Sequence, residues 1–272
     1  MRLVGFRDGR TTMVARRIDE TSLIPIASVA DFWANPESAL RNPTRYARVA
    51  LDEVELVPPV LPSARVICIG LNYAEHAVEG SWEPPEYPTV FARWTASLAV
   101  DGTPVAVPPG EDGLDWEGEL VVAIGRTVTR ETAGDVASAV FAYAAFNDLT
   151  ARRAQKLTSQ WTLGKNADNS GPIGDFVTAD EVGSIERGLI IETRVNGETV
   201  QSDTTASMIF PIGKLLQFLT QTMTLNPGDL IATGTPSGVG YVRNPPRLLH
   251  AGDIVDIEIE RVGLLSTPVV DS

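Results

Sequence analysis

Short apolar runs separated by turn residues dominate the chain after residue 60 and predict a structure made mostly of β-strands. The expected strands are Val66–Gly70, Thr89–Ala92, Glu119–Ile124, Leu189–Val195, Leu230–Thr233 and Ile254–Ile259. Asp8-Gly9 and Asn196-Gly197 each indicate a hairpin, because Asp-Gly and Asn-Gly are favoured two-residue turns between antiparallel strands. The sequence therefore predicts antiparallel pairing near both of these turns.

Helical spacing is less frequent in this chain. Apolar residues recur with a helical period from Ile212 to Thr220, and Asp135 precedes a helix expected from Val136 to about Val140. The strands do not alternate regularly with helices, as a Rossmann fold or a TIM barrel requires. The pattern favours an α+β fold, with a mixed β-sheet that forms a roll or a partial barrel.

A cluster of prolines between Pro58 and Pro62 favours an extended connection and interrupts regular structure. The charge changes at the same place: residues 1–60 hold 8 basic and 8 acidic side chains, whereas residues 61–272 hold 14 basic and 27 acidic ones. We therefore predict a small N-terminal α+β domain over residues 1–60 and a catalytic domain over residues 61–272.

The formal net charge of −13 gives no basic surface for a polyanion, so neither nucleic acid nor an acidic membrane is an expected partner. No apolar stretch reaches the roughly 18 residues that span a bilayer. Charged residues interrupt the first eight positions, which argues against a secretory signal. The single cysteine, Cys68, lies in an expected buried strand. A cytoplasmic location is expected.

Five carboxylates fall between Glu111 and Glu119 with no basic residue among them. On a strand, Glu117 and Glu119 point to the same face and offer two carboxylates to one ion. Such close like charges are stabilised by a hard divalent cation such as Mg²⁺ or Mn²⁺. A solvated strand edge would account for the same residues.

Asp148 ends the apolar run from Val140 to Phe146 and offers a third oxygen ligand, although an Asx turn or a helix cap would also explain it. Arg152 and Gln155 follow, one helical turn apart, and can face the same pocket or form an exposed polar face. Lys165 stands between glycine and asparagine, where it forms either a pocket wall or an exposed loop.

His76 and Glu79 have the spacing at which a helix places a carboxylate beside an imidazole. The carboxylate would orient the ring and raise its basicity, which suits activation of a water molecule; a surface salt bridge is the alternative. A glycine-rich turn from Thr233 to Gly240 could bind a small carboxylate through its backbone N–H groups.

Several of these segments, in this order, resemble motifs of the fumarylacetoacetate hydrolase family. The matching segments are Ile69–His76, Glu117–Gly125, Asn147–Arg152 with Gln155, Gly164-Lys165, Val195–Glu198 and Thr233–Gly240. The resemblance extends from about Pro62 to the C-terminus and points to the acylpyruvase and 2-hydroxyhepta-2,4-diene-1,7-dioate isomerase branch. It implies the fold of the family's C-terminal domain and a homodimer.

The resemblance also implies roles for individual residues. The implied ligands of Mg²⁺ or Mn²⁺ are Glu117, Glu119 and Asp148; the implied catalytic groups are His76, Glu79 and Lys165; and the implied substrate contacts are Arg152, Gln155 and Thr235. The implied activity is hydrolysis of a C–C bond in an acylpyruvate or a related 2,4-diketo acid. Decarboxylation of an oxaloacetate-type 2-oxoacid and enol–keto isomerisation are the alternatives.

The sequence departs from the common family pattern at two positions. Arg93 replaces a frequent lysine, and Arg153 replaces an aspartate that often follows the arginine matched by Arg152. Because Arg and Lys recognise acids differently, the substrate of one particular family member cannot be assigned to this chain.

A loop from Ser81 to Glu86 is expected to close over the substrate. A metal-stabilised binding module without turnover is the hypothesis from another class, and the intact set of acids and bases argues against it.

Overall fold

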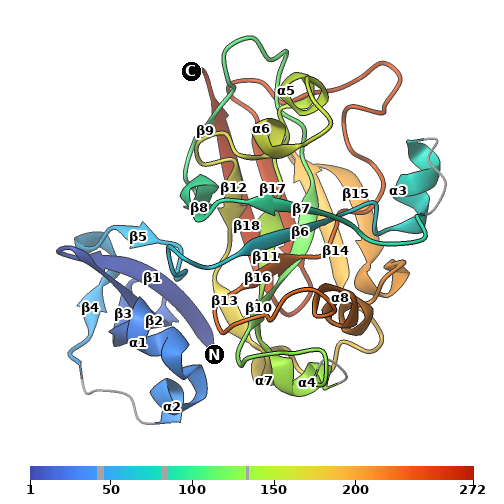
Figure 1. The fold of residues 1–272 in the computed structure, drawn as a ribbon. Coiled ribbons are helices and arrows are strands. Elements are labelled where there is room, and N and C mark those ends of the chain that lie inside the picture. The colour runs from blue at the N-terminus through green and yellow to red at the C-terminus, as the bar shows by residue number, and fades with distance from the viewer. Residues whose placement is uncertain (42–45, 81–84, 133–134) are drawn as a thin grey trace.

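The computed structural model describes residues 1–41, 46–80, 85–132 and 135–272. It shows a mixed α+β protein built on two β-sheets, which confirms the predicted fold class (Figure 1). The loop that we expect to close over the substrate begins with residues 81–84, which lie outside the described residues.

The larger sheet has 13 strands and continues from the N-terminal segment into the rest of the chain. In sheet order its strands are β4 (Val49–Ala50), β3 (Ser22–Ser28), β2 (Thr11–Asp19), β1 (Arg2–Asp8), β13 (Phe176–Thr178), β11 (Val140–Asn147), β10 (Gly118–Ile124), β16 (Leu230–Ala232), β6 (Val66–Gly70) and β7 (Thr89–Arg93), with β5 (Leu56–Val57), β8 (Leu98–Val100) and β12 (Gly171–Ile173) beside this path. Because β1 pairs with β13, the first 60 residues share a sheet with the remainder. The domain boundary at residue 60 stays a prediction.

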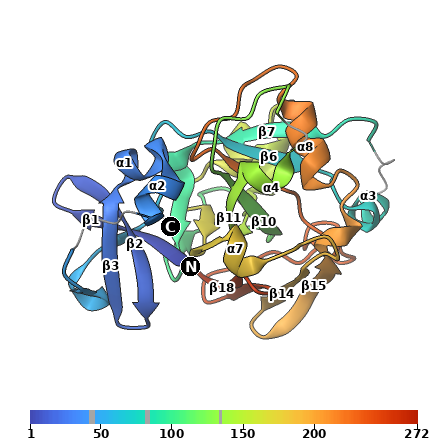
Figure 2. The same cartoon turned by 90° about the horizontal axis from the view of Figure 1, so that it is seen from below.

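The smaller sheet has five strands and lies against β10 and β11, on the side opposite to β6 and β7 (Figure 2). In sheet order its strands are β15 (Glu198–Thr204), β14 (Ile190–Val195), β17 (Ile254–Ile259), β18 (Gly263–Val270) and β9 (Val105–Ala106). The helices are α1 (Val29–Ala34), α2 (Pro36–Arg41), α3 (Ala74–Glu79), α4 (Val136–Ala139), α5 (Arg152–Lys156), α6 (Thr162–Lys165), α7 (Ala179–Val182) and α8 (Ile212–Leu219). None of the helices in the described ranges is both long and apolar enough to cross a membrane.

The hairpin at Asn196-Gly197 is confirmed, because Val195 pairs with Glu198 across the turn. The hairpin predicted at Asp8-Gly9 forms one residue later than expected. Asp8 pairs with Thr11, so the turn consists of Gly9 and Arg10. This register gives the left-handed backbone, with φ of 57°, to the glycine rather than to Asp8.

Strands β10 and β11 form the centre of the molecule and are buried on both faces. Leu120 and Val122 enter one hydrophobic core, whereas Val121 and Ala123 enter the other. β11 is not among the predicted strands, and the helix expected before it ends one residue earlier than predicted, at Ala139. β11 contains three alanines, which are depleted in strands, whereas the equally buried β10 is rich in leucine, valine and isoleucine.

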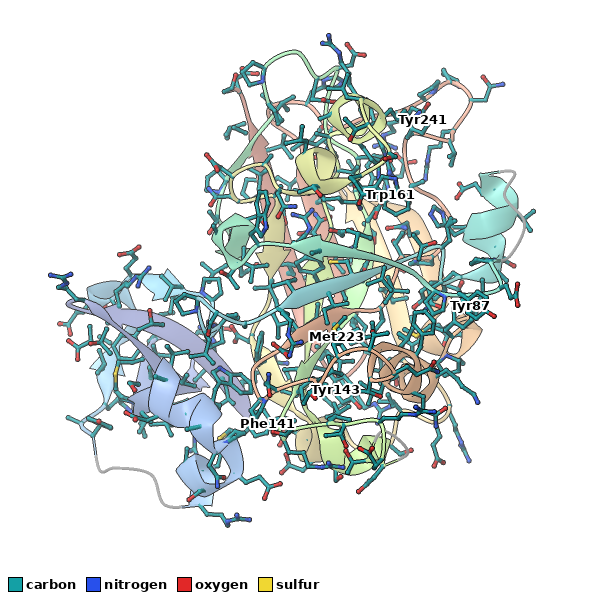
Figure 3. The ribbon with its side chains drawn as sticks, viewed as in Figure 1. Tyr87, Phe141, Tyr143, Trp161, Met223 and Tyr241 are labelled. Atoms are coloured by element: carbon teal, nitrogen blue, oxygen red, sulfur yellow. The ribbon has the colours of Figure 1, made fainter. Side chains whose placement is uncertain are left out.

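Trp33 of α1 attaches the N-terminal segment to the central strands. Its ring packs edge-on against Phe141 of β11 and Phe176 of β13, with centroid distances of 5.5 and 6.3 Å. Figure 3 shows Phe141 at this junction. The indole N–H donates to the carbonyl of Pro59 at 2.8 Å, and the side chain is 2% exposed.

Replacing Trp33 with Ala is expected to lower the free energy of unfolding by about 3–5 kcal/mol, because it leaves a cavity between the segments. Thermal unfolding followed by circular dichroism should show one transition at a lower temperature. Two separate transitions would contradict the shared sheet. Trp94→Ala is the control: that side chain is 57% exposed, so its loss should change stability by less than about 0.5 kcal/mol.

Candidate active site and metal centre

A cavity of about 390 Å³ opens beside the start of β10. Seven of the predicted site residues line it: His76, Glu117, Glu119, Arg152, Gln155, Lys165 and Thr235. Glu79 contacts His76, and Asp148 contacts Lys165. The structure therefore brings all nine predicted site residues into one neighbourhood, although their roles stay predictions.

His76 and Glu79 lie one turn apart on α3, as their spacing predicts. The imidazole Nδ1 is 3.5 Å from Glu79 Oε2, at the long end of the range for a hydrogen bond. The backbone N–H of Gly238 donates to the same carboxylate at 2.9 Å. Although burial favours the neutral form, the hydrogen bonds from His76 and Gly238 lower the pKa of Glu79.

Gly238 is required at this position by its backbone. Its φ of 103° lies in the region that favours glycine, and a Cβ would collide with the carbonyl oxygen of Val200. The carboxylate beside His76 is therefore held by a main-chain N–H in a backbone conformation that residues other than glycine adopt only with strain.

Three carboxylates meet where β10 begins and β11 ends. Gly118 pairs with Asn147 across these antiparallel strands, which brings Glu117 and Glu119 beside Asp148. The backbone N–H of Asp148 donates to the carbonyl of Glu117 at 2.9 Å. Each carboxylate offers one oxygen, and these oxygens lie within 4.8 Å of one another, all in buried side chains.

Lys165 and Arg93 are two of the cations that contact this triad. Lys165 Nζ lies 2.6 Å from a Glu117 oxygen and 2.5 Å from an Asp148 oxygen. Arg93 forms an ion pair with Asp148 through Nε. Lys165 is 1% exposed and Arg93 is 2% exposed, so these pairs are shielded from water.

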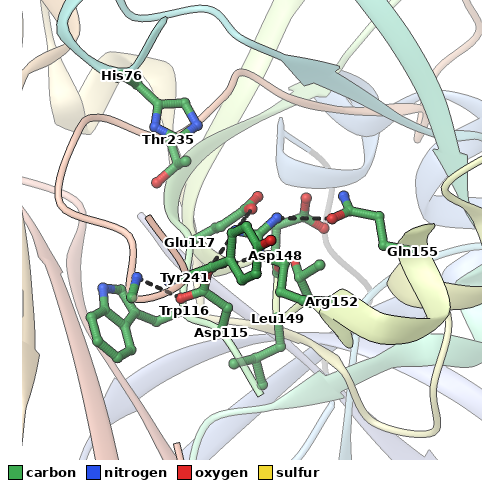
Figure 4. Close-up of polar contacts among 12 residues, drawn as sticks. His76, Asp115, Trp116, Glu117, Asp148, Leu149, Arg152, Gln155, Thr235 and Tyr241 are labelled. Atoms are coloured by element: carbon green, nitrogen blue, oxygen red, sulfur yellow. Dashed lines mark hydrogen bonds and ion pairs between the residues drawn. The ribbon is translucent and has the colours of Figure 1, made fainter. Parts of the chain in front are cut away.

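Arg152 connects the triad to a fourth buried carboxylate, Asp115. Its guanidinium lies 2.6 Å from oxygens of both Asp115 and Glu117, and it donates to Gln155 Oε1 at 3.1 Å. In Figure 4, His76 and Thr235 lie on one side of Glu117, and Arg152 and Gln155 lie on the other.

Glu119 differs from the other carboxylates of the triad because no cation contacts it among the described residues. The only hydrogen bond that its carboxylate accepts from those residues comes from the backbone N–H of Gly234, at 2.8 Å. Burial and the charges of Asp148 and Glu117 raise the pKa of Glu119 well above its usual value. In contrast, Lys165 and Arg152 overcome the effect of burial and lower the pKa of Glu117.

The donor set fits a hard divalent cation. The cluster contains the carboxylates of Asp115, Glu117, Glu119 and Asp148 and the cations of Arg93, Arg152 and Lys165. With all seven groups ionised, one negative charge is left in excess, and it lies on the side of Glu119. Burial and this excess are why the pKa of that carboxyl group is raised in the metal-free protein. A divalent cation would change this balance to one positive charge, which suits an anionic substrate, and Mg²⁺ and Mn²⁺ prefer such oxygen ligands.

The predicted substrate contacts differ in their remaining bonding capacity. Gln155 and Arg152 line the cavity while hydrogen-bonded to each other. The Thr235 hydroxyl donates to the carbonyl of Gly118 at 2.9 Å and accepts from Gln201 at 2.8 Å. Since its proton is already donated, Thr235 can offer a ligand mainly its remaining lone pair.

Sequence reasoning did not identify Arg93 and Asp115 as members of the site. We noted Arg93 only as a departure from the family pattern, yet its side chain also donates to Ser170 and to the Leu149 carbonyl. A basic residue at the end of an apolar strand is the signal that could have identified it. Arg153, the other departure, contacts the Gly110 carbonyl and does not line the cavity.

Comparison with known proteins places this geometry in a family. Residues 65–270 match the model described as the fumarylacetoacetate (FAA) hydrolase C-terminal domain. The chain belongs to this family. The resemblance seen in the sequence is thereby confirmed, and the family's members act on small molecules and typically use a divalent metal.

Named relatives indicate which branch of the family is similar. The chain is 44% identical over 227 residues to oxaloacetate tautomerase YisK of Bacillus subtilis, covering 81% of this chain and 74% of that protein. It is 36% identical over 251 residues to the mitochondrial oxaloacetate tautomerase fahd2 of Xenopus laevis, covering 88% and 77%. A solved 5-carboxymethyl-2-hydroxymuconate delta-isomerase from Mycobacterium smegmatis superposes with a TM-score of 0.82 at 30% identity, covering 100% of both chains. These relatives are named as tautomerases and an isomerase, whereas the activity predicted first from the sequence is hydrolysis.

We expect Glu119→Gln to weaken Mg²⁺ or Mn²⁺ binding by at least about tenfold, because even outer partners of metal ligands have effects of that size. In EDTA at pH 7, the same variant should unfold at a higher temperature than the wild type. The raised pKa of Glu119 means that this carboxyl group destabilises the metal-free protein at pH 7. The difference should vanish as the pH falls to the ordinary value of about 4.5.

Glu117→Gln is the matched control for this prediction. It should also lose metal affinity in titration calorimetry, but it should destabilise the metal-free protein by about 1.5–3 kcal/mol, because Lys165 and Arg152 lose a charged partner. Equal effects of the two variants on the metal-free protein would show that the carboxylates are not distinguished as described.

Proposed function

We propose that this chain is a divalent-metal-dependent enol–keto tautomerase that acts on oxaloacetate or a closely related 2-oxo acid. The observation that carries the proposal is that one cavity of about 390 Å³ contains His76 and two carboxylates of the triad. A base and an electrophilic centre on the same substrate are what enol–keto conversion requires. The similarity to proteins named oxaloacetate tautomerase supports the same substrate class.

A divalent ion held by Glu117, Glu119 and Asp148 would supply Lewis-acid stabilisation of negative charge on the 2-oxo oxygen. Lys165 places a second positive charge beside two of these carboxylates. Its ammonium group is buried and fixed, so it adds stabilisation without reorganisation.

His76 moves the proton in this proposal. Glu79 accepts from Nδ1–H and stabilises the ring in that tautomer, which leaves the Nε2 lone pair to exchange a proton with the substrate. Conversion of enol to keto removes the proton of the 2-hydroxyl and adds one at C3. Arg152 and Gln155, fixed to each other, would orient the substrate carboxylate.

Hydrolysis of an acylpyruvate is the second candidate, and the His76–Glu79 pair favours it as well. An imidazole oriented by a carboxylate can take a proton from water as readily as from an enol. Lys165 and Gln155 would then stabilise charge on the attacked carbonyl. Loss of CO₂ from oxaloacetate is a third outcome of the same site chemistry.

An ultraviolet assay distinguishes these reactions. With Mg²⁺ or Mn²⁺, we expect faster loss of the oxaloacetate enol band with no pyruvate or CO₂ formed, and EDTA should abolish the effect. Appearance of pyruvate and a second carboxylic acid from acetylpyruvate would support the hydrolase instead. Pyruvate and CO₂ from oxaloacetate would support the decarboxylase.

We expect His76→Gln to lower kcat for tautomerisation by about 10²–10⁴-fold, the usual contribution of a general acid or base. The affinity for Mg²⁺, measured by calorimetry, should stay within about twofold of the wild type, because His76 is not part of the triad. Wild-type turnover in this variant would remove His76 from the mechanism. The homodimer and the cytoplasmic location stay predictions.

A further inference from the structure

Lys156 is a cavity residue that the account of the reaction does not use. It ends helix α5, four positions after Arg152, and both side chains line the cavity. Residues four apart share one face of a helix, so the face of α5 that presents Arg152 also presents Lys156. Lys156 is solvent-exposed whereas Gln155 is buried, which places the lysine toward the mouth of the cavity.

Lys156 differs from the other cations of the cavity in its partners. Arg152 and Lys165 each pair with two buried carboxylates. Among the described residues, Lys156 forms no ion pair: it donates to the Tyr241 hydroxyl and lies 3.5 Å from the centre of that ring. Tyr241 therefore restrains this ammonium group without neutralising it. These contacts place Tyr241 beside α5, and Figure 3 shows its position.

The electrostatic surroundings of Lys156 favour an anion. Partial burial and the positive charge of Arg152 lower its pKa. A ligand carboxylate beside this lysine would offset both effects. Ser159 also lines the cavity, and its hydroxyl can donate a further hydrogen bond, whereas the Thr158 hydroxyl already donates to the carbonyl of Gln160 at 3.0 Å.

We propose that Lys156 binds the second carboxylate of a dianionic 2-oxo acid and thereby selects dicarboxylates over monocarboxylates. This inference rests on the proposed function, because it assigns the first carboxylate and the 2-oxo group to the inner end of the cavity. The substrate then lies between the buried charge cluster and the mouth. Its two carboxylates meet cations at both ends of the cavity.

Arg153 provides a matched control on the same helix. It carries the same charge as Lys156 and is also exposed, but its guanidinium contacts the Gly110 carbonyl and it does not line the cavity. Arg153→Gln and Lys156→Gln therefore change the net charge of the protein equally. Only the second removes a cation from the proposed carboxylate site.

The test uses two four-carbon 2-hydroxy acids, malate and 2-hydroxybutyrate, which differ in whether C4 is a carboxylate or a methyl group. Titration calorimetry of the Mg²⁺-containing protein should show that the wild type binds malate more tightly. Lys156→Gln should weaken malate binding by roughly tenfold, the lower end for a hydrogen bond between charged groups. It should leave 2-hydroxybutyrate binding unchanged.

Arg153→Gln and Lys156→Arg should both keep the preference for malate. Equal affinity of the wild type for the two acids, including no binding of either, would overturn the proposal. A preference that survives in Lys156→Gln would also overturn it. If the preference depends on Lys156 but oxaloacetate is not tautomerised, the carboxylate site stands and the proposed function fails.

Discussion

Confining charge in a dry interior is the constraint on which this structure depends. Removing a carboxylate or an ammonium group from water costs several kcal/mol per ion, and pairing repays that cost only with well-placed partners. Here Lys165 and Arg152 pair with two carboxylates each, whereas from the part of the chain that the structure describes the carboxylate of Glu119 accepts only the backbone N–H of Gly234. The uncompensated negative charge is therefore confined to the carboxylate of Glu119, which a divalent cation would neutralise. The electrostatic cost of burying charge is concentrated at the candidate metal site.

The two sheets make this arrangement possible by close approach of their backbones. Gly118 separates Glu117 from Glu119, and a Cβ on it would collide with the Thr193 hydroxyl of the smaller sheet. The absence of a side chain lets the smaller sheet cover this part of β10. Helices α5 and α6 also contribute to the cavity: Lys156, the last residue of α5, brings positive charge to its mouth, and Lys165, the last residue of α6, brings positive charge to the buried carboxylates.

Local spacing was sufficient to predict the parts of the site that lie close in sequence. Glu117 and Glu119 both line the cavity, as expected from their alternation along a strand. His76 and Glu79 lie one turn apart on α3, as their spacing predicts. Long-range partners were not predictable in this way: Arg93 reaches Asp148 across 55 residues, and only the order of strands in the sheet brings them together. Strand β11 was not predicted because three of its eight residues are alanines, which are depleted in strands, whereas the equally buried β10 is rich in the β-branched and aliphatic residues that indicate one.

Gly238 shows how a single peptide unit can bear on both folding and chemistry. Its N–H fixes Glu79, its carbonyl accepts from the Trp116 indole at 3.1 Å, and its backbone excludes a side chain. Selection for a folded protein and selection for a working enzyme would therefore reject the same substitutions at 238. At Glu79 the two pressures separate, because a glutamine preserves the packing while it loses the charge. The His76–Glu79 pair can therefore change in evolution by substitution of Glu79, but not by substitution of Gly238, which holds that carboxylate.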